Sequence, residues 1–126
     1  MARTNFDASG PIFTLTRCDG SLIHHAGNNQ LYFSHPDPPA GLLRTRLRVW
    51  RSADLGVSWV QHATVWGMAA GYSALTVMGG RATAAATGTD ADNNHGAAPL
   101  GVLYDRNNHS MLVFEAQSVS FTTIAA

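Results

Sequence analysis

Apolar positions along the chain occur in short runs separated by clusters of Gly, Asn, Asp and Pro. This pattern is typical of β-strands joined by turns, and no stretch has the spacing of a convincing amphipathic helix. The predicted strands are Ile12–Thr16, Ser21–His25, Gln30–Ser34, Arg46–Arg51, Trp59–Val65, Tyr72–Met78, Leu100–Tyr104 and Met111–Phe121, the last bent or broken. We therefore expect an all-β protein, built as a sandwich, a barrel or the blades of a propeller.

The segment 79–99 departs from this pattern. Ala, Gly, Thr, Asp and Asn dominate it, and almost no large apolar residue interrupts them. Such a composition predicts a long flexible loop between two strands. The length of 126 residues otherwise suits one modest domain, 1–126.

Charge narrows the range of partners. The eight basic residues are all Arg, and eight acidic residues balance them to a formal net charge of zero. This balance argues against nucleic acid as a partner, and the absence of a long apolar run argues against a membrane span. Half of the arginines nevertheless lie in one predicted strand and its approach, at Arg44, Arg46, Arg48 and Arg51.

Directly after this strand, the chain fills every specified position of the Asp-box pattern S-x-D-x-G-x-x-W, with Ser52, Asp54, Gly56 and Trp59. An Asp two residues before a Gly favours a tight hairpin in which the carboxylate accepts backbone N–H bonds, and the Trp can fold back beneath the turn. We expect the box to have a structural role.

The motifs around the box follow one another in a characteristic order. They are Cys18-Asp19-Gly20-Ser21, Phe33-Ser34-His35-Pro36, Arg44, the Asp box, Gly71-Tyr72-Ser73-Ala74-Leu75 and Leu103-Tyr104-Asp105. This co-linear set resembles the exo-α-sialidases, most closely the lysosomal type, over nearly the whole chain. The resemblance implies a six-bladed β-propeller that releases terminal sialic acid from sialylated glycans with retention of configuration and without a cofactor. It also implies a lysosomal or secreted location.

The resemblance assigns roles to particular residues. Tyr72 would be the nucleophile, because a neutral phenol can approach an anomeric carbon that carries a carboxylate. Arg44 would bind that carboxylate through its bidentate guanidinium group, with Arg46 as the alternative, while Arg48 and Arg51 are expected on solvated faces. Asp105 stands where the family has a Glu that braces another arginine.

Other residues of the family pattern have no match in this sequence. They are the first and second arginines of the carboxylate-binding triad, the acid/base Asp and the Glu that activates the tyrosine. A phenol needs a base to attack at neutral pH. We therefore expect the chain to form a C-terminal portion of the propeller, about two to three blades. We expect it to be inactive alone, with the missing N-terminal part as its partner.

The sequence also allows an alternative function and gives no sign of a metal site. The same strands and Asp box would also suit a non-catalytic β-propeller module that binds glycans or proteins. No metal site is predicted, because the adjacent His24 and His25 face opposite sides of a strand and the other histidines lie without Cys or Glu at ligand spacing.

Overall fold

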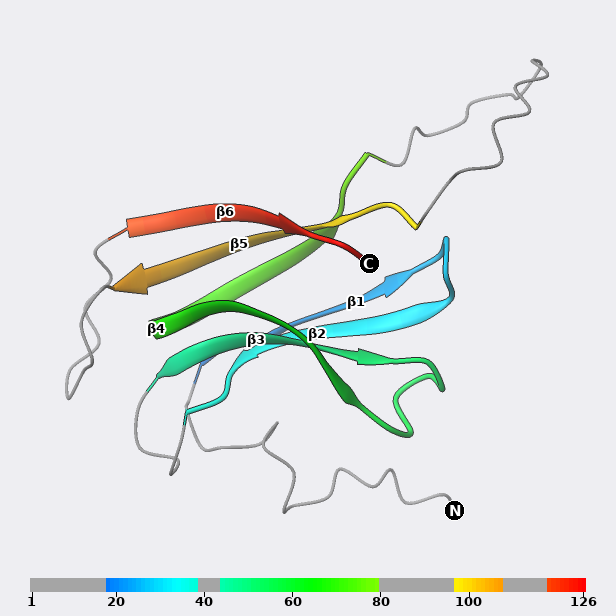
Figure 1. The fold of residues 1–126 in the computed structure, drawn as a ribbon, viewed down its shortest axis with the longest axis horizontal. Coiled ribbons are helices and arrows are strands. Elements are labelled where there is room, and N and C mark those ends of the chain that lie inside the picture. The colour runs from blue at the N-terminus through cyan, green and yellow to red at the C-terminus, as the bar shows by residue number, and fades with distance from the viewer. Residues whose placement is uncertain (1–17, 39–43, 80–96, 108–117) are drawn as a thin grey trace.

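The computed structural model describes residues 18–38, 44–79, 97–107 and 118–126, and 69% of these residues lie in strands. The strands are β1 (Ser21–His25), β2 (Gln30–Pro36), β3 (Thr45–Ser52), β4 (Val60–Val77), β5 (Leu100–Asn107) and β6 (Ser118–Ile124). Each strand pairs antiparallel with its neighbours in sequence, so the six form one sheet in the order β1-β2-β3-β4-β5-β6. The sheet curls into a half-barrel (Figure 1).

The all-β prediction is confirmed. The curled sheet is compatible with part of a propeller, but the propeller itself stays a prediction because the six strands form one continuous sheet. The predicted strand Ile12–Thr16 lies outside the described residues, as do positions 111–117 of the predicted last strand and most of the predicted loop 79–99. At the ends of that loop, the Met78 N–H donates to the Pro99 carbonyl at 2.8 Å.

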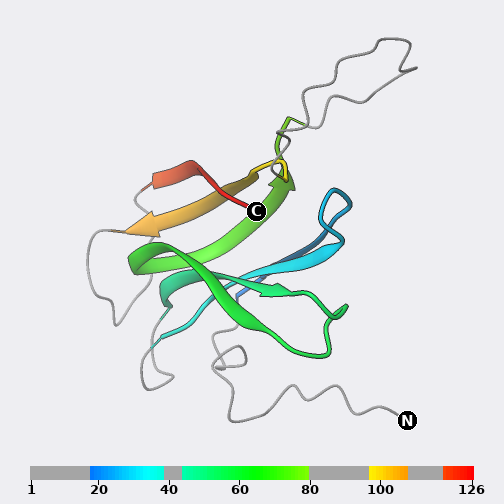
Figure 2. The same ribbon diagram turned by 45° about the vertical axis from the view of Figure 1, so that its right-hand side comes forward.

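One prediction about the strands is wrong. The segments Trp59–Val65 and Tyr72–Met78, expected as separate strands, lie in the single 18-residue strand β4 except for their end residues Trp59 and Met78. Its first half pairs with β3 and its second half with β5, and the two halves meet at Ala69, which pairs with both Thr45 and Asn107. Figures 1 and 2 show β4 bending from the side of the sheet that holds β3 to the side that holds β5.

The core lies on the concave face of the curl. Alternation along β2, β3 and β5 turns one set of side chains inward, as expected for strands with one buried face. The buried cluster consists of Tyr32, Leu47, Val49, Ala70, Leu75, Leu100, Val102 and Tyr104. Burial of these side chains stabilises the curled sheet at roughly 1.5–3 kcal/mol for each large aliphatic residue.

Hydroxyl groups fasten the second half of β4 across the concave face to the first two strands. The Ser73 and Ser34 hydroxyls are hydrogen-bonded at 2.8 Å, and the Ser21 hydroxyl accepts from the Leu75 N–H at 3.0 Å. Because β4 carries these contacts and also pairs with β3 and β5, it links both halves of the fold. It is also the strand that carries Tyr72.

Candidate functional site

A β-bulge in β4 determines where Tyr72 points. Ala70 pairs with Arg106 and Ser73 pairs with Tyr104, so two residues of β4, Gly71 and Tyr72, oppose the single residue Asp105 of β5. A bulge bends the strand locally and redirects the side chains beside it. Ser73 consequently reaches inward to Ser34, while Tyr72 is turned outward with 49% of its surface exposed.

Asp105 completes the bulge. Its Oδ1 accepts a hydrogen bond from the Gly71 N–H at 2.8 Å. Gly71 is buried, and an N–H left without a partner there would be costly, so the carboxylate satisfies the group that the bulge removes from the strand ladder. The resemblance implied that Asp105 braces an arginine side chain. In the structure its carboxylate accepts a hydrogen bond from this backbone amide instead.

Arg44 approaches the bulge from the opposite neighbour of β4. Its carbonyl accepts a hydrogen bond from the Ala70 N–H at 2.9 Å, which places the residue beside the bulge. Its guanidinium carbon lies over the Tyr72 ring, 5.8 Å from the ring centroid. This distance is within the range of a cation–π contact. The structure therefore brings together Arg44 and Tyr72, the two residues that the resemblance assigned to carboxylate binding and nucleophilic attack.

A pocket of about 330 Å³ opens beside Tyr72. Its lining residues are Tyr72, Ser73, Ala74, Leu103, Tyr104, Asp105 and Val119. The volume lies at the lower end of the range found for small-molecule sites. Arg44 is not part of the lining, but its guanidinium group lies over the ring of the lining residue Tyr72.

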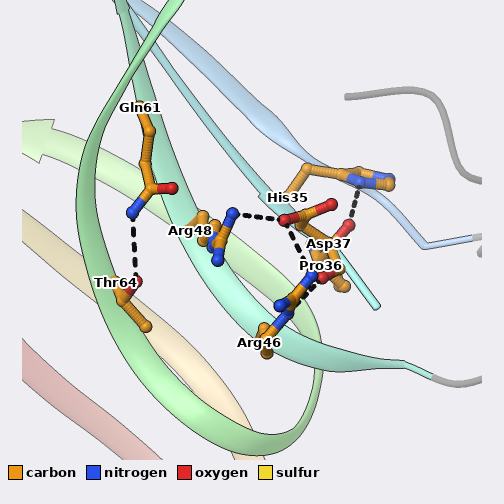
Figure 3. Close-up of polar contacts among 7 residues, drawn as sticks. All are labelled: His35, Pro36, Asp37, Arg46, Arg48, Gln61 and Thr64. Atoms are coloured by element: carbon orange, nitrogen blue, oxygen red, sulfur yellow. Dashed lines mark hydrogen bonds and ion pairs between the residues drawn. The ribbon is translucent and has the colours of Figure 1, made fainter. Parts of the chain in front are cut away.

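Arg46, the alternative carboxylate ligand, is engaged elsewhere. Its backbone is left-handed, with φ of 54°, at a register shift between β3 and β4. This conformation is uncommon for a residue with a side chain. The Arg46 Nε donates to the Asp37 carbonyl at 2.7 Å, and its Nη2 lies 3.3 Å from the Asp37 Oδ2 (Figure 3).

The expectation that Arg48 lies on a solvated face is wrong, and Arg51 is half-buried. The Arg48 Nη1 is 2.6 Å from the Oδ2 of Asp37, whose side chain is buried, and the Arg48 side chain is only 18% exposed (Figure 3). The Nε atoms of Arg48 and Arg51 are both buried. The antiparallel register explains the ion pair, because His35 pairs with Arg48 and Asp37 follows just beyond the end of β2.

The Asp box forms the turn between β3 and β4. Asp54 Oδ1 accepts from the Ser52 hydroxyl at 2.7 Å and from the Ser58 N–H at 2.8 Å, and Oδ2 accepts from the Ser58 hydroxyl at 2.5 Å. The Ser52 hydroxyl in turn accepts from the Gly56 N–H at 2.8 Å. Both oxygens of Asp54 are therefore used inside the turn.

The backbone conformation of the turn and the pKa of Asp54 are both consistent with these hydrogen bonds. Leu55 and Gly56 have φ of 56° and 94°, and glycine accommodates the second value without strain. Trp59 packs edge-on against Phe33, with ring centroids 6.2 Å apart. The hydrogen bonds from the Ser58 hydroxyl, the Ser58 N–H and the Ser52 hydroxyl lower the pKa of Asp54 from 3.8 to about 2.

Two features of the site were missed from the sequence. Asp37 was not predicted as a site residue, although an acidic residue shortly before an Arg-rich strand was a signal for an ion pair. The acceptor for the Gly71 amide had no signal, because it depends on the register between β4 and β5.

The described part of the chain contains no group of three or more His, Cys, Asp or Glu residues placed to hold a metal ion. Within the same residues, no helix is long and apolar enough to cross a membrane. No family model matches the chain, and no match was found among the curated proteins.

Proposed function

We propose that this chain supplies the carboxylate-binding arginine and the tyrosine nucleophile of a retaining exo-α-sialidase. The observation that carries the proposal is the position of the Arg44 guanidinium group over the ring of an exposed tyrosine on a β-bulge. Tyr72 lies in β4, and Arg44 immediately precedes β3. The sequence motifs that name them say nothing about their distance, so their proximity is independent support.

The chemistry requires both groups. The Arg44 guanidinium would pair with the sialic acid carboxylate and fix the orientation of the sugar. The Tyr72 oxygen would then form a bond to the anomeric carbon while the bond from that carbon to the aglycone oxygen breaks. The phenolic proton passes to a base, and the leaving oxygen takes up a proton from an acid. Water afterwards hydrolyses the aryl glycoside and restores the phenol.

A second candidate function is a module that binds sialylated glycans without cleaving them. The observation in its favour is the use of the carboxylate beside Tyr72. Asp105 bonds the Gly71 amide, so it serves local structure. A binding module would need the Arg44–Tyr72 surface but no base beside the phenol.

Both functions require carboxylate-dependent binding, which can be measured on the full chain. We expect methyl α-sialoside to shift the NMR signals of Gly71 and Tyr72, whereas its neutral carboxamide analogue leaves them unchanged. Arg44→Met should abolish the shifts. Arg44→Lys should weaken them, because an ammonium group lacks the bidentate fork. Equal binding of the acid and the carboxamide would refute the proposal.

A covalent probe separates the enzyme from the binding module. A fluorinated sialic acid inactivator with fluoride as its leaving group needs no acid to protonate that group. At pH about 10, where an ordinary phenol loses its proton to the solvent, the attack needs no separate base either. We expect mass spectrometry to locate its adduct on Tyr72 and to find none in Tyr72→Phe. Carboxylate-dependent binding without an adduct in the unmodified chain would favour the binding module.

A further inference from the structure

Part of the wall of the pocket beside Tyr72 is apolar and exposed to solvent. Ala74, Leu103 and Val119 supply apolar wall, and Leu103 and Val119 are 48% and 69% exposed. Phe121 pairs with Leu103 across β5 and β6 and is also exposed, so it extends the apolar surface beyond the pocket. Figures 1 and 2 show the three strands β4, β5 and β6 that carry this surface lying side by side.

The charged groups around Tyr72 give a ligand its direction. Asp105 is the one carboxylate in the pocket lining, and the Arg44 guanidinium lies over the tyrosine ring, outside that lining. An anionic group placed in the pocket would face Asp105, whereas the same group placed toward Arg44 would be paired. A bound anionic ligand therefore places its charged group near Arg44. The pocket then holds an uncharged part of the same molecule.

We infer that the pocket binds an apolar aglycone and that the preferred ligands are sialosides whose sugar is linked to an alkyl or lipid-like group. This inference rests on the proposed function for the sugar itself, which requires the carboxylate to pair with Arg44. Among the polar groups of the lining, the Ser73 hydroxyl is already bonded to Ser34 and the Asp105 carboxylate to the Gly71 N–H, so fewer groups are left for a polar aglycone. Exposed apolar wall next to an anchoring cation matches a ligand with an acidic head and an apolar tail.

Three probes test the inference on the full chain by NMR titration, each below its critical micelle concentration. They are methyl α-sialoside, octyl α-sialoside and octyl β-glucoside. We expect the octyl sialoside to bind at least about tenfold more tightly than the methyl sialoside, the effect of burying about two methylene groups. We expect shifts at Leu103 and Val119 with the octyl sialoside only.

Variants locate the effect. Leu103→Asn and Val119→Asn should each remove most of the preference for the octyl group while leaving the affinity for the methyl sialoside unchanged. Leu22→Asn is the matched control, because Leu22 is a strand leucine on β1, outside the pocket, that is 59% exposed against 48% for Leu103. It should preserve the preference. Amide spectra without ligand show whether each variant is folded, and Val119 provides a second site if the change at Leu103 disturbs the sheet.

The possible failures are distinguishable. Equal affinity for the two sialosides, with binding that still depends on Arg44, would overturn the aglycone site and leave the proposed function intact. Binding of neither sialoside would overturn both. If octyl β-glucoside bound as tightly as octyl α-sialoside, the pocket would be a site for alkyl chains alone, and the anchoring role of Arg44 would be refuted.

Discussion

Removal of the Asp105 carboxylate should loosen the bulge that aims Tyr72. In Asp105→Ala, the buried Gly71 N–H loses the acceptor that now lies 2.8 Å away. A buried donor without a partner costs about 1–3 kcal/mol. This loss is a substantial fraction of the roughly 5–15 kcal/mol by which most domains are stable. Asp105→Asn retains an oxygen acceptor, so we expect it to lose less than Asp105→Ala.

Urea denaturation of both variants gives the free energies of unfolding, and amide hydrogen exchange reports on Gly71 itself. Exchange at Gly71 should accelerate in Asp105→Ala and much less in Asp105→Asn. Asp19→Ala is the control for loss of a negative charge, because Asp19 is an exposed residue before β1. The reasoning is refuted if Asp105→Ala is no less stable than Asp19→Ala, or if Asn and Ala at position 105 destabilise equally.

Three further predictions address the turn, the ion pair and catalysis. Because the pKa of Asp54 is lowered to about 2 in the fold, its hydrogen bonds stabilise the protein above pH about 4 and are lost as the pH falls toward 2. The stability difference between wild type and Asp54→Asn, measured in urea, should shrink over that window, and a constant difference would contradict this. Asp37→Ala should lower the free energy of unfolding by about 3 kcal/mol, because it leaves the partly buried Arg48 without its partner. Arg48→Gln should lower the free energy of unfolding more than Arg46→Gln, because the Arg46 side chain is 34% exposed. The reverse order in urea denaturation would contradict the view that Arg48 is the main partner of Asp37. Finally, the chain should release no fluorophore from a fluorogenic sialoside at neutral pH, because the first step, in which the fluorophore leaves, needs a base to take the phenolic proton of Tyr72. Activity that survives purification and disappears in Tyr72→Phe would disprove this.

The sequence predicted the strands well where alternation and turn residues agree, as in β1, β2 and β3. It failed at the middle of β4. The stretch between Gly67 and Gly71 lacks β-branched residues, and local propensity there is weak. Pairing with β3 on one side and β5 on the other overrides that weakness, and only the assembled sheet supplies it.

For the candidate site, the motifs identified Arg44 and Tyr72, and the structure places them together. Neither the bulge nor the hydrogen bond from Gly71 to Asp105 could be read from the sequence, because a register shift depends on which residues face each other across strands. The environment of Arg48 was mispredicted for a similar reason. It was expected on a solvated face because strand arginines usually are exposed, but the register between β2 and β3 brings Asp37 close to it.

The neighbour-to-neighbour order of the six strands sets the order in which the site can be assembled. Every strand pairs with the one before it in the chain, so pairing can proceed as the polypeptide is synthesised. The contact between the Ala70 N–H and the Arg44 carbonyl requires only β3 and β4, and it can form before β5 exists. The bulge is secured later, when β5 delivers Asp105 to Gly71. A nascent chain that ends before β5 can therefore bring Arg44 near Tyr72 but cannot yet hold the tyrosine in its final direction.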